Sequence, residues 1–330
     1  MTNLNNQIRR KSWSHFWQQG QLHSLASSMP DNYHGAIANF WQRELKSLTT
    51  EHAILDIGTG NGALPAMIFQ IHQENMPEID AIDLAEIAPA WTQELPEKIA
   101  RRLRFHGNTQ AESLPFPDAR FDLCISQYGF EYTHLDISSK ELARALKPGG
   151  RLSLVLHHAD SHLVTVAREE LRHNSWLRSD ASPLITAPAV LPYLQMASQG
   201  RVAELAQNPS ANTARSNLNQ AMQGLSAIAA QSAYPDLLHE SAEFIAQVLG
   251  STGSGIITAD HAVQRLQHYQ QALEQAALRH QELCSCAMDD KGIVHMQNLL
   301  TQHGIKDIDI AILKENNYLL GWTLTARKSS

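Results

Sequence analysis

A short apolar strand that runs into a turn with three glycines constrains this chain more than any other feature. Residues 53–63 read Ala-Ile-Leu-Asp-Ile-Gly-Thr-Gly-Asn-Gly-Ala, and residues with helical spacing follow them. Gly58, Gly60 and Gly62 permit a tight turn and a close approach of a ligand, because no Cβ stands in the way. A helix that begins near Asn61 would point free N–H groups at that ligand. The segment therefore predicts a strand, a ligand-binding turn and a helix.

Strand and helix patterns continue to alternate up to residue 157. The predicted strands are 53–57, 79–83, 103–106, 121–126 and 151–157. The predicted helices between them are 62–73, 86–101 and 138–146. Such alternation is typical of a parallel sheet covered on both faces. Two later strands, 308–314 and 319–327, are joined by a short polar link that suits a hairpin, so the last strand is expected to run antiparallel.

Helical segments flank and interrupt this α/β pattern. Residues 1–50 are predicted to form N-terminal helices that cover a cofactor or substrate, although their aromatic residues could simply pack on the core. Residues 161–300 are Gln- and Ala-rich and are predicted to be almost wholly helical. They interrupt a sheet domain made of 51–160 and 301–330, at the edge where ligands bind in open α/β sheets. The insertion is therefore expected to be a substrate lid, a dimerisation arm, or both.

Composition excludes several classes of protein. The chain has 330 residues and a net charge of −7, which argues against binding to nucleic acid or to an anionic membrane surface. No stretch approaches 18 uncharged apolar residues, and the polar N-terminus does not resemble a secretory signal. Three cysteines are too few for a disulfide framework. We expect a cytoplasmic protein that has no nucleic-acid or membrane partner, with a homodimer through the insertion as an open alternative.

The glycine turn fits a dinucleotide cofactor, but it also fits a second class of cofactor that contains a ribose. Gly58, Gly60 and Ala63 match the G-x-G-x-x-G/A pattern of dinucleotide sites. Asp83, at the end of the second strand, could accept both ribose hydroxyls of either class. These residues alone therefore do not show which class of cofactor binds.

Further segments of the sequence favour a cofactor other than a dinucleotide. The run Asp56-x-Gly58-x-Gly60-x-Gly62 resembles the first motif of class I S-adenosylmethionine-dependent methyltransferases. Thr-Gln-Ala-Glu-Ser-Leu-Pro-Phe-Pro-Asp (109–118), Phe-Asp-Leu-Cys-Ile-Ser (121–126) and Leu-Lys-Pro-Gly-Gly-Arg-Leu (146–152) resemble later motifs of that family, in the family's order. The chain resembles the small-molecule branch of this family.

The resemblance implies a fold, a cofactor and a set of cofactor contacts. The fold is α/β, a seven-stranded, mostly parallel Rossmann-like sheet with an antiparallel last strand, here with a large helical insertion. The cofactor is S-adenosylmethionine, released as S-adenosylhomocysteine after transfer to an O, N or C nucleophile of a small-molecule acceptor. Gln110 stands where the family usually has an adenine-contacting Asp, and its amide can still bond an adenine edge. The implied cofactor-binding residues are Tyr33, Asp56, Gly58, Thr59, Gly60, Gly62, Asp83, Leu84, Asn108, Gln110, Ala111 and Gln127.

Candidate residues for the transfer step follow the fourth and fifth strands. Methyl transfer from a sulfonium needs the nucleophile held about 3–3.5 Å from the methyl carbon, and a base helps when the acceptor carries a proton. His157 or His158, after the fifth strand, is the predicted general base, and Tyr128 and Glu131 are predicted to orient the acceptor. The alternative for all four is packing or hydrogen bonding within their own loops.

The sequence gives no signal for a metal site and leaves two other functions open. The chain has 17 histidines, but it lacks HExxH and paired Cys-x-x-Cys motifs, so no metal is expected. One alternative function is a protein methyltransferase that docks its partner on the helical insertion. The other is a non-catalytic scaffold that binds S-adenosylmethionine without turnover.

Overall fold

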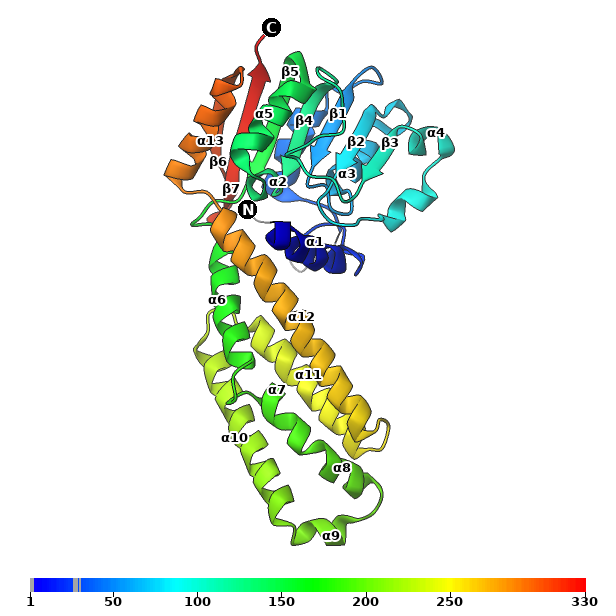
Figure 1. Cartoon of the computed structure of the whole chain (residues 1–330), viewed down its shortest axis with the longest axis vertical. Helices are drawn as coiled ribbons and strands as arrows, with labels where there is room; N and C mark the ends of the chain where they lie inside the picture. The colour runs from blue at the N-terminus through cyan, green and yellow to red at the C-terminus, as the bar shows by residue number, and fades with distance from the viewer. Residues whose placement is uncertain (1–2, 26–28, 30) are drawn as a thin grey trace. The chain divides into compact units, whose positions relative to one another are not determined.

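The computed structural model describes residues 3–25, 29 and 31–330 (Figure 1). Residues 1–2, 26–28 and 30, which belong to the predicted N-terminal segment 1–50, lie outside the described residues. The chain divides into two compact units, Met1–Thr165 with Glu282–Ser330, and Val166–Gln281.

The first unit is built on a seven-stranded sheet with the order β3-β2-β1-β4-β5-β7-β6. Its strands are β1 (Ala53–Ile57), β2 (Glu78–Ile82), β3 (Leu103–His106), β4 (Phe121–Gln127), β5 (Leu146–Leu156), β6 (Ile305–Glu315) and β7 (Tyr318–Lys328). Strands β1 to β5 pair in parallel, and β7 runs antiparallel to both β5 and β6. Asn316, at φ +52°, begins the tight link between β6 and β7. This arrangement confirms the predicted fold class.

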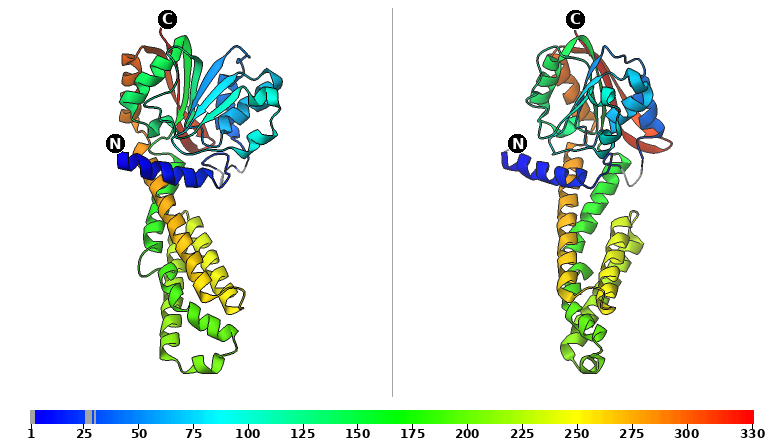
Figure 2. Two further views of the ribbon diagram at one scale, coloured as in Figure 1. Left: turned by 45° about the vertical axis from the view of Figure 1, so that its right-hand side comes forward. Right: turned by 90° about the vertical axis from the view of Figure 1, so that its right-hand side faces the viewer.

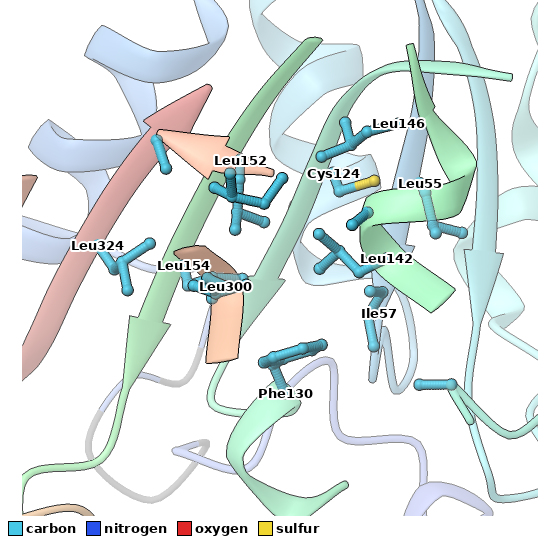
Figure 3. Close-up of a cluster of buried hydrophobic side chains, with 14 of the residues drawn as sticks. Leu55, Ile57, Cys124, Phe130, Leu142, Leu146, Leu152, Leu154, Leu300 and Leu324 are labelled. Carbon is cyan, nitrogen blue, oxygen red and sulfur yellow. The ribbon is translucent and has the colours of Figure 1, made fainter. Parts of the chain in front are cut away.

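Helices cover both faces of the sheet. The helices of the first unit are α1 (Asn3–Trp17), α2 (Gly35–Leu45), α3 (Ala63–His72), α4 (Glu97–Ala100), α5 (Leu135–Ala145) and α13 (Asp290–Gln302), with short 3-10 turns η1 (Gln73–Asn75), η2 (Ala90–Glu94) and η3 (Phe130–Tyr132). One apolar cluster joins α2 and α3 to the sheet through residues such as Trp41 and Ile68. A second cluster joins α5 and α13 to the other face, and Figure 3 shows Leu142, Leu154 and Leu300 among its members. Because all five residues of β1 are buried, its run of apolar residues was a clear signal in the sequence.

The predicted helix over 86–101 is wrong. Only η2 and the single turn α4 are regular in this segment. Pro89 and Pro96 stand immediately before these two pieces. Proline has no backbone N–H and clashes with the preceding turn, so a continuous helix cannot pass through either position.

The second unit is wholly helical in its regular structure. Its elements are α6 (His162–Leu177), α7 (Pro183–Thr186), η4 (Ala187–Ala189), α8 (Leu191–Ser198), α9 (Val202–Ala206), α10 (Pro209–Gln231), α11 (Asp236–Gly253) and α12 (Ala259–Cys286), of which α6 and α12 carry the chain between the units. Leu218, Ile245 and Leu266 belong to its own apolar core. Even the 28-residue α12 does not combine the length and apolar character needed to cross a bilayer, nor does any other helix in the described part of the chain.

The helical insertion ends earlier in the chain than predicted. The insertion was expected to run to residue 300, whereas residues from Glu282 onward belong to the first unit. The reason is α13, whose Ile293, Met296 and Leu300 are buried in the cluster that covers one face of the sheet.

Candidate functional site

A cavity lies at the carboxyl edge of the sheet, entirely within the first unit. It is lined by residues at the ends of β1, β2 and β4, and by residues of α1. Figure 2 shows α1, in blue at the N-terminus, running along this end of the sheet. The cavity holds about 990 Å³ of space, including the part open to solvent.

Most of the predicted cofactor-binding residues line this cavity. They are Tyr33, Asp56, Gly58, Thr59, Asp83, Leu84, Gln110, Ala111 and Gln127. Gly60, Gly62 and Asn108 are not among the lining residues. Asn108, at φ +55°, donates its backbone N–H to the carbonyl of Ala85 and so belongs to the turn behind the cavity.

The three glycines of the turn adopt backbone conformations that favour glycine. Gly58, Gly60 and Gly62 have φ values of +69°, +55° and +83°. A Cβ on Gly58 would lie 2.9 Å from the Cα of Gly129, and one on Gly60 would lie 2.6 Å from the ring of Trp17. The turn therefore approaches both the loop after β4 and the cover helix α1 more closely than any other residue type allows.

Two buried aspartates stand beside this turn. Asp83 accepts hydrogen bonds from the backbone N–H groups of Gly60 and Ala85, both at 2.8 Å. Burial raises the pKa of Asp83 to about 6. Burial also raises the pKa of Asp56 to about 7; the Thr59 hydroxyl opposes this rise and the charge of Asp83 adds to it. A pyrophosphate would be repelled by such a pair, whereas a cationic ligand would be attracted.

Some residues that line the cavity carry a buried polar atom with no partner in hydrogen-bonding geometry among the described residues. They are Asn6 Oδ1, Asp56 Oδ2 and Gln127 Nε2. The amide oxygen of Gln127 is already engaged, because it accepts a hydrogen bond from Trp41 Nε1 at 2.5 Å. Buried polar groups are normally paired and are costly when they are not. The set therefore fits a ligand that carries both donors and acceptors.

Aromatic side chains form the wall contributed by α1. Trp13 stacks on Trp17 with ring centroids 5.9 Å apart and meets Tyr132 edge-on at 6.0 Å. Trp13 Nε1 donates to the carboxylate of Glu282 at 2.9 Å, and Arg9 forms an ion pair with the same carboxylate. Arg9 also donates to the backbone carbonyl of Tyr132 at 2.8 Å. These contacts fix α1 over the cavity.

Of the predicted transfer residues, only Tyr128 lines the cavity. Its hydroxyl donates to the carbonyl of Leu320 at 3.1 Å, and its backbone has φ +55°. Glu131 is buried and accepts hydrogen bonds from the backbone N–H and ring Nδ1 of His157, at 2.8 and 2.7 Å. The His157 ring stacks on Tyr128 with centroids 4.0 Å apart. Glu131 and His157 thus lie behind the tyrosine rather than at the cavity surface.

His158 faces a different part of the structure. Its ring stacks on Trp322 at 4.5 Å, and its Nδ1 accepts a hydrogen bond from the backbone N–H of Asp160 at 2.9 Å. It does not line the cavity. Within the described residues, no group of three or more His, Cys, Asp or Glu side chains could hold a metal ion.

The structure adds cavity residues that the motifs did not indicate. The lining residues Asn6, Arg9, Trp13 and Trp17 all belong to α1. The helical spacing of the tryptophans predicted the helix, but it contained no signal for the surface against which that helix packs. His23 also lines the cavity and lies in no recognisable pattern.

Comparisons with known proteins show similarity over part of the sheet domain. Residues 54–150 match the family model described as a methyltransferase domain. The chain is 38% identical over 111 residues to the uncharacterized methyltransferase YcgJ of Bacillus subtilis (strain 168), covering 33% of this chain and 42% of that protein. It is 32% identical over 149 residues to the ubiquinone/menaquinone biosynthesis C-methyltransferase UbiE of Cellvibrio japonicus (strain Ueda107), covering 43% and 59%. The chain thus spans only about half the length of these relatives.

One solved structure aligns with part of the chain. It is the Burkholderia thailandensis 1,6-didemethyltoxoflavin-N1-methyltransferase with bound 1,6-didemethyltoxoflavin and S-adenosylhomocysteine. The alignment has a TM-score of 0.36 and 21% identity, and covers 47% of this chain and 63% of that one.

Proposed function

The chain contains a class I, Rossmann-like methyltransferase domain, and from this premise we propose that it transfers a methyl group from S-adenosylmethionine to a small-molecule acceptor. The observation that carries the proposal is the set of unpartnered buried polar atoms on residues that line the cavity beside the glycine turn. When bound, the sulfonium of this cofactor supplies an electrophilic methyl group for in-line displacement.

The residues of the cavity complement the parts of this cofactor. The free oxygen of Asp56 suits the ammonium of an amino acid, and the carboxylate of Asp83 can accept ribose hydroxyls while it keeps its two backbone donors. Leu84 offers an apolar surface to the adenine, and Gln110 offers an amide to its edge. The negative charge of the two aspartates favours a sulfonium cation over the pyrophosphate of a nicotinamide cofactor.

The acceptor end of the cavity is formed by α1 and by the turn after β4. Arg9, Trp13 and Tyr132 line this end, and their contacts hold α1 in place. A small molecule can occupy such a covered space, whereas the side chain of a folded protein would have to displace α1. We therefore favour a small acceptor over a protein acceptor.

The geometry also assigns roles in the transfer. Tyr128 lines the cavity and is proposed to contact the acceptor. Glu131 and His157 are proposed to be positioning residues, because His157 packs against the rings of Tyr128 and Tyr132, which line the cavity, and does not line it itself.

Calorimetric titration with S-adenosylhomocysteine, with NADH as the control, tests the cofactor assignment. Saturable binding of the first and none of the second is expected. Binding of NADH alone, or of neither, would contradict the proposal. Methyl-labelled S-adenosylmethionine and a panel of small acceptors then test the transfer. Transfer to proteins alone would favour the protein-methyltransferase alternative, and cofactor binding without transfer would favour the scaffold.

The role of the helical unit, as lid or as dimerisation arm, stays a prediction. The unit buries its own apolar core. Ile256 is 77% exposed and Val202 is 60% exposed in this unit. Sedimentation equilibrium of the whole chain separates the two roles, since a dimerisation arm requires a dimer whose association is weakened by Ile256→Asp or Val202→Asp.

A further inference from the structure

Glu282, near the end of α12, holds two residues of the cavity wall although it does not line the cavity itself. It is the residue at which the chain returns to the first unit after the helical insertion. One of its carboxylate oxygens forms an ion pair with Arg9, and the other accepts a hydrogen bond from Trp13 Nε1 at 2.9 Å. Arg9 and Trp13 lie one turn apart on α1, and both line the cavity. A single carboxylate therefore fixes two neighbouring side chains of the wall.

These contacts are largely withdrawn from solvent. The side chain of Arg9 is 11% exposed and that of Glu282 is 19% exposed. An ion pair on the surface contributes little, whereas removal of one partner of a buried pair leaves the other charge without its counter-charge. Hydrogen bonds that involve an ionised group are also stronger than those between neutral groups. The position of this part of α1 is therefore expected to depend strongly on Glu282.

The end of α1 is held by a different residue. Asn61, in the glycine turn, donates its side-chain N–H to the backbone carbonyl of Trp17 at 2.9 Å. This contact does not involve Glu282. Loss of Glu282 is therefore expected to loosen α1 around Arg9 and Trp13, while Trp17 stays beside the glycine turn.

We propose that Glu282 is a positioning residue of the site: its carboxylate sets where Arg9 and Trp13 stand in the cavity wall, and so controls how long a ligand stays in the cavity. This inference rests on the proposed function. A wall that is fixed keeps its contacts with the ligand, and loss of such contacts appears mainly as faster dissociation. The last residues of α12 thus act on the cavity, although none of them lines it.

The test measures how fast labelled S-adenosylhomocysteine leaves the whole protein when an excess of unlabelled ligand is added. Glu282→Ala removes both contacts and should raise the dissociation rate about 10- to 100-fold. Glu282→Gln keeps an oxygen that can accept from Trp13 but no charge for Arg9, so its rate should lie between those of wild type and Glu282→Ala. Glu274→Ala, at an exposed position of the same helix, is the matched control and should leave the rate unchanged.

A double variant separates positioning from a general loosening of the structure. Trp13→Phe keeps an aromatic ring and removes the N–H donor. It should raise the dissociation rate in the wild-type background, and by a smaller factor in the Glu282→Ala background, where the contact is already absent. If Glu282→Ala does not fold, Glu282→Met takes its place, because it fills similar space without either contact.

Two results would overturn the inference while the proposed function stands. One is an unchanged dissociation rate in the folded Glu282 variants. The other is an equal effect of Trp13→Phe in both backgrounds, which would show that Trp13 and Glu282 act independently. Failure of the wild-type protein to bind S-adenosylhomocysteine would overturn both the inference and the proposed function.

Discussion

Replacement of Asp56 by Asn should make the ligand-free protein more stable and its binding of S-adenosylhomocysteine weaker. The Asp56 side chain is 1% exposed, and its Oδ2 has no partner in hydrogen-bonding geometry among the described residues. Asparagine has nearly the same size but no charge. The substitution therefore removes the cost of a buried carboxylate and also removes the proposed partner of the ammonium.

The size of the effect follows from the pKa of Asp56. Burial raises it from 3.8 to about 7, so the folded protein holds more protons than the unfolded chain between these two values. The contribution of this residue to stability therefore falls as the pH rises from about 4 to 7, and is constant above that range. At 1.36 kcal/mol for each pH unit, the cost is roughly 4 kcal/mol at pH 8 and roughly 2 kcal/mol at pH 5. Asp56→Asn should recover at most these amounts.

Urea unfolding of wild type and variant at pH 5 and pH 8, followed by tryptophan fluorescence, measures this gain. All tryptophans except Trp176 belong to the first unit, so the fluorescence reports mainly on the unit that contains Asp56. Asp80→Asn is the matched control on the neighbouring strand. Hydrogen bonds and charge from Arg104 and His106 outweigh burial and lower the pKa of Asp80, so this variant should be destabilised at pH 8.

The reasoning would be refuted by either of two results for Asp56→Asn. One is the absence of any gain at pH 8. The other is a gain of equal size at pH 5 and pH 8, because a pH-independent gain would come from packing and not from removal of a charge. Weaker binding of S-adenosylhomocysteine must accompany the gain if Asp56 holds the ammonium.

Three other substitutions test separate parts of the site. Asp83→Ala should weaken S-adenosylhomocysteine by about 1–3 kcal/mol in titration calorimetry, since a charged acceptor of ribose hydroxyls is lost; unchanged affinity in a folded variant would rule out that contact. Gly60→Ala should disrupt α1 and cofactor binding because its Cβ would lie 2.6 Å from the Trp17 ring, whereas Gly149→Ala, at φ +74° in open space, controls for backbone strain alone. His157→Ala should lower kcat while the Kd for S-adenosylhomocysteine stays within about twofold; equal effects on both would show a general loss of structure.

The sequence was informative where one local pattern decides the structure. The bounds predicted for β1 and β3 agree with the observed strands, because short apolar runs end at the glycine turn and at the turn after His106. The conformation of the glycine turn was likewise predictable. The prediction of a helix over 86–101 was wrong because Pro89 and Pro96 interrupt the segment and limit it to two short helical pieces.

The contacts of individual side chains could not be read in the same way. His157 and His158 follow β5 directly, as predicted, but neighbouring residues of an extended chain point in opposite directions. One ring therefore meets Tyr128 and the other meets Trp322, and neither reaches the cavity surface. The place of His23 among the residues that line the cavity is likewise encoded by no local pattern of residues.

Three buried aspartates of the sheet unit differ in the direction of their pKa shift according to whether they line the cavity. Away from the cavity, Asp80 is paired with Arg104 at 2.8 Å and with His106 at 2.9 Å, and its pKa is lowered. At the cavity, burial raises the pKa of both Asp56 and Asp83, and no cation is paired with either within the described residues. An unpaired buried carboxylate costs stability, and that cost is removed when a ligand supplies the missing charge. A cationic cofactor would thus stabilise the first unit most at the pH values where Asp56 is ionised.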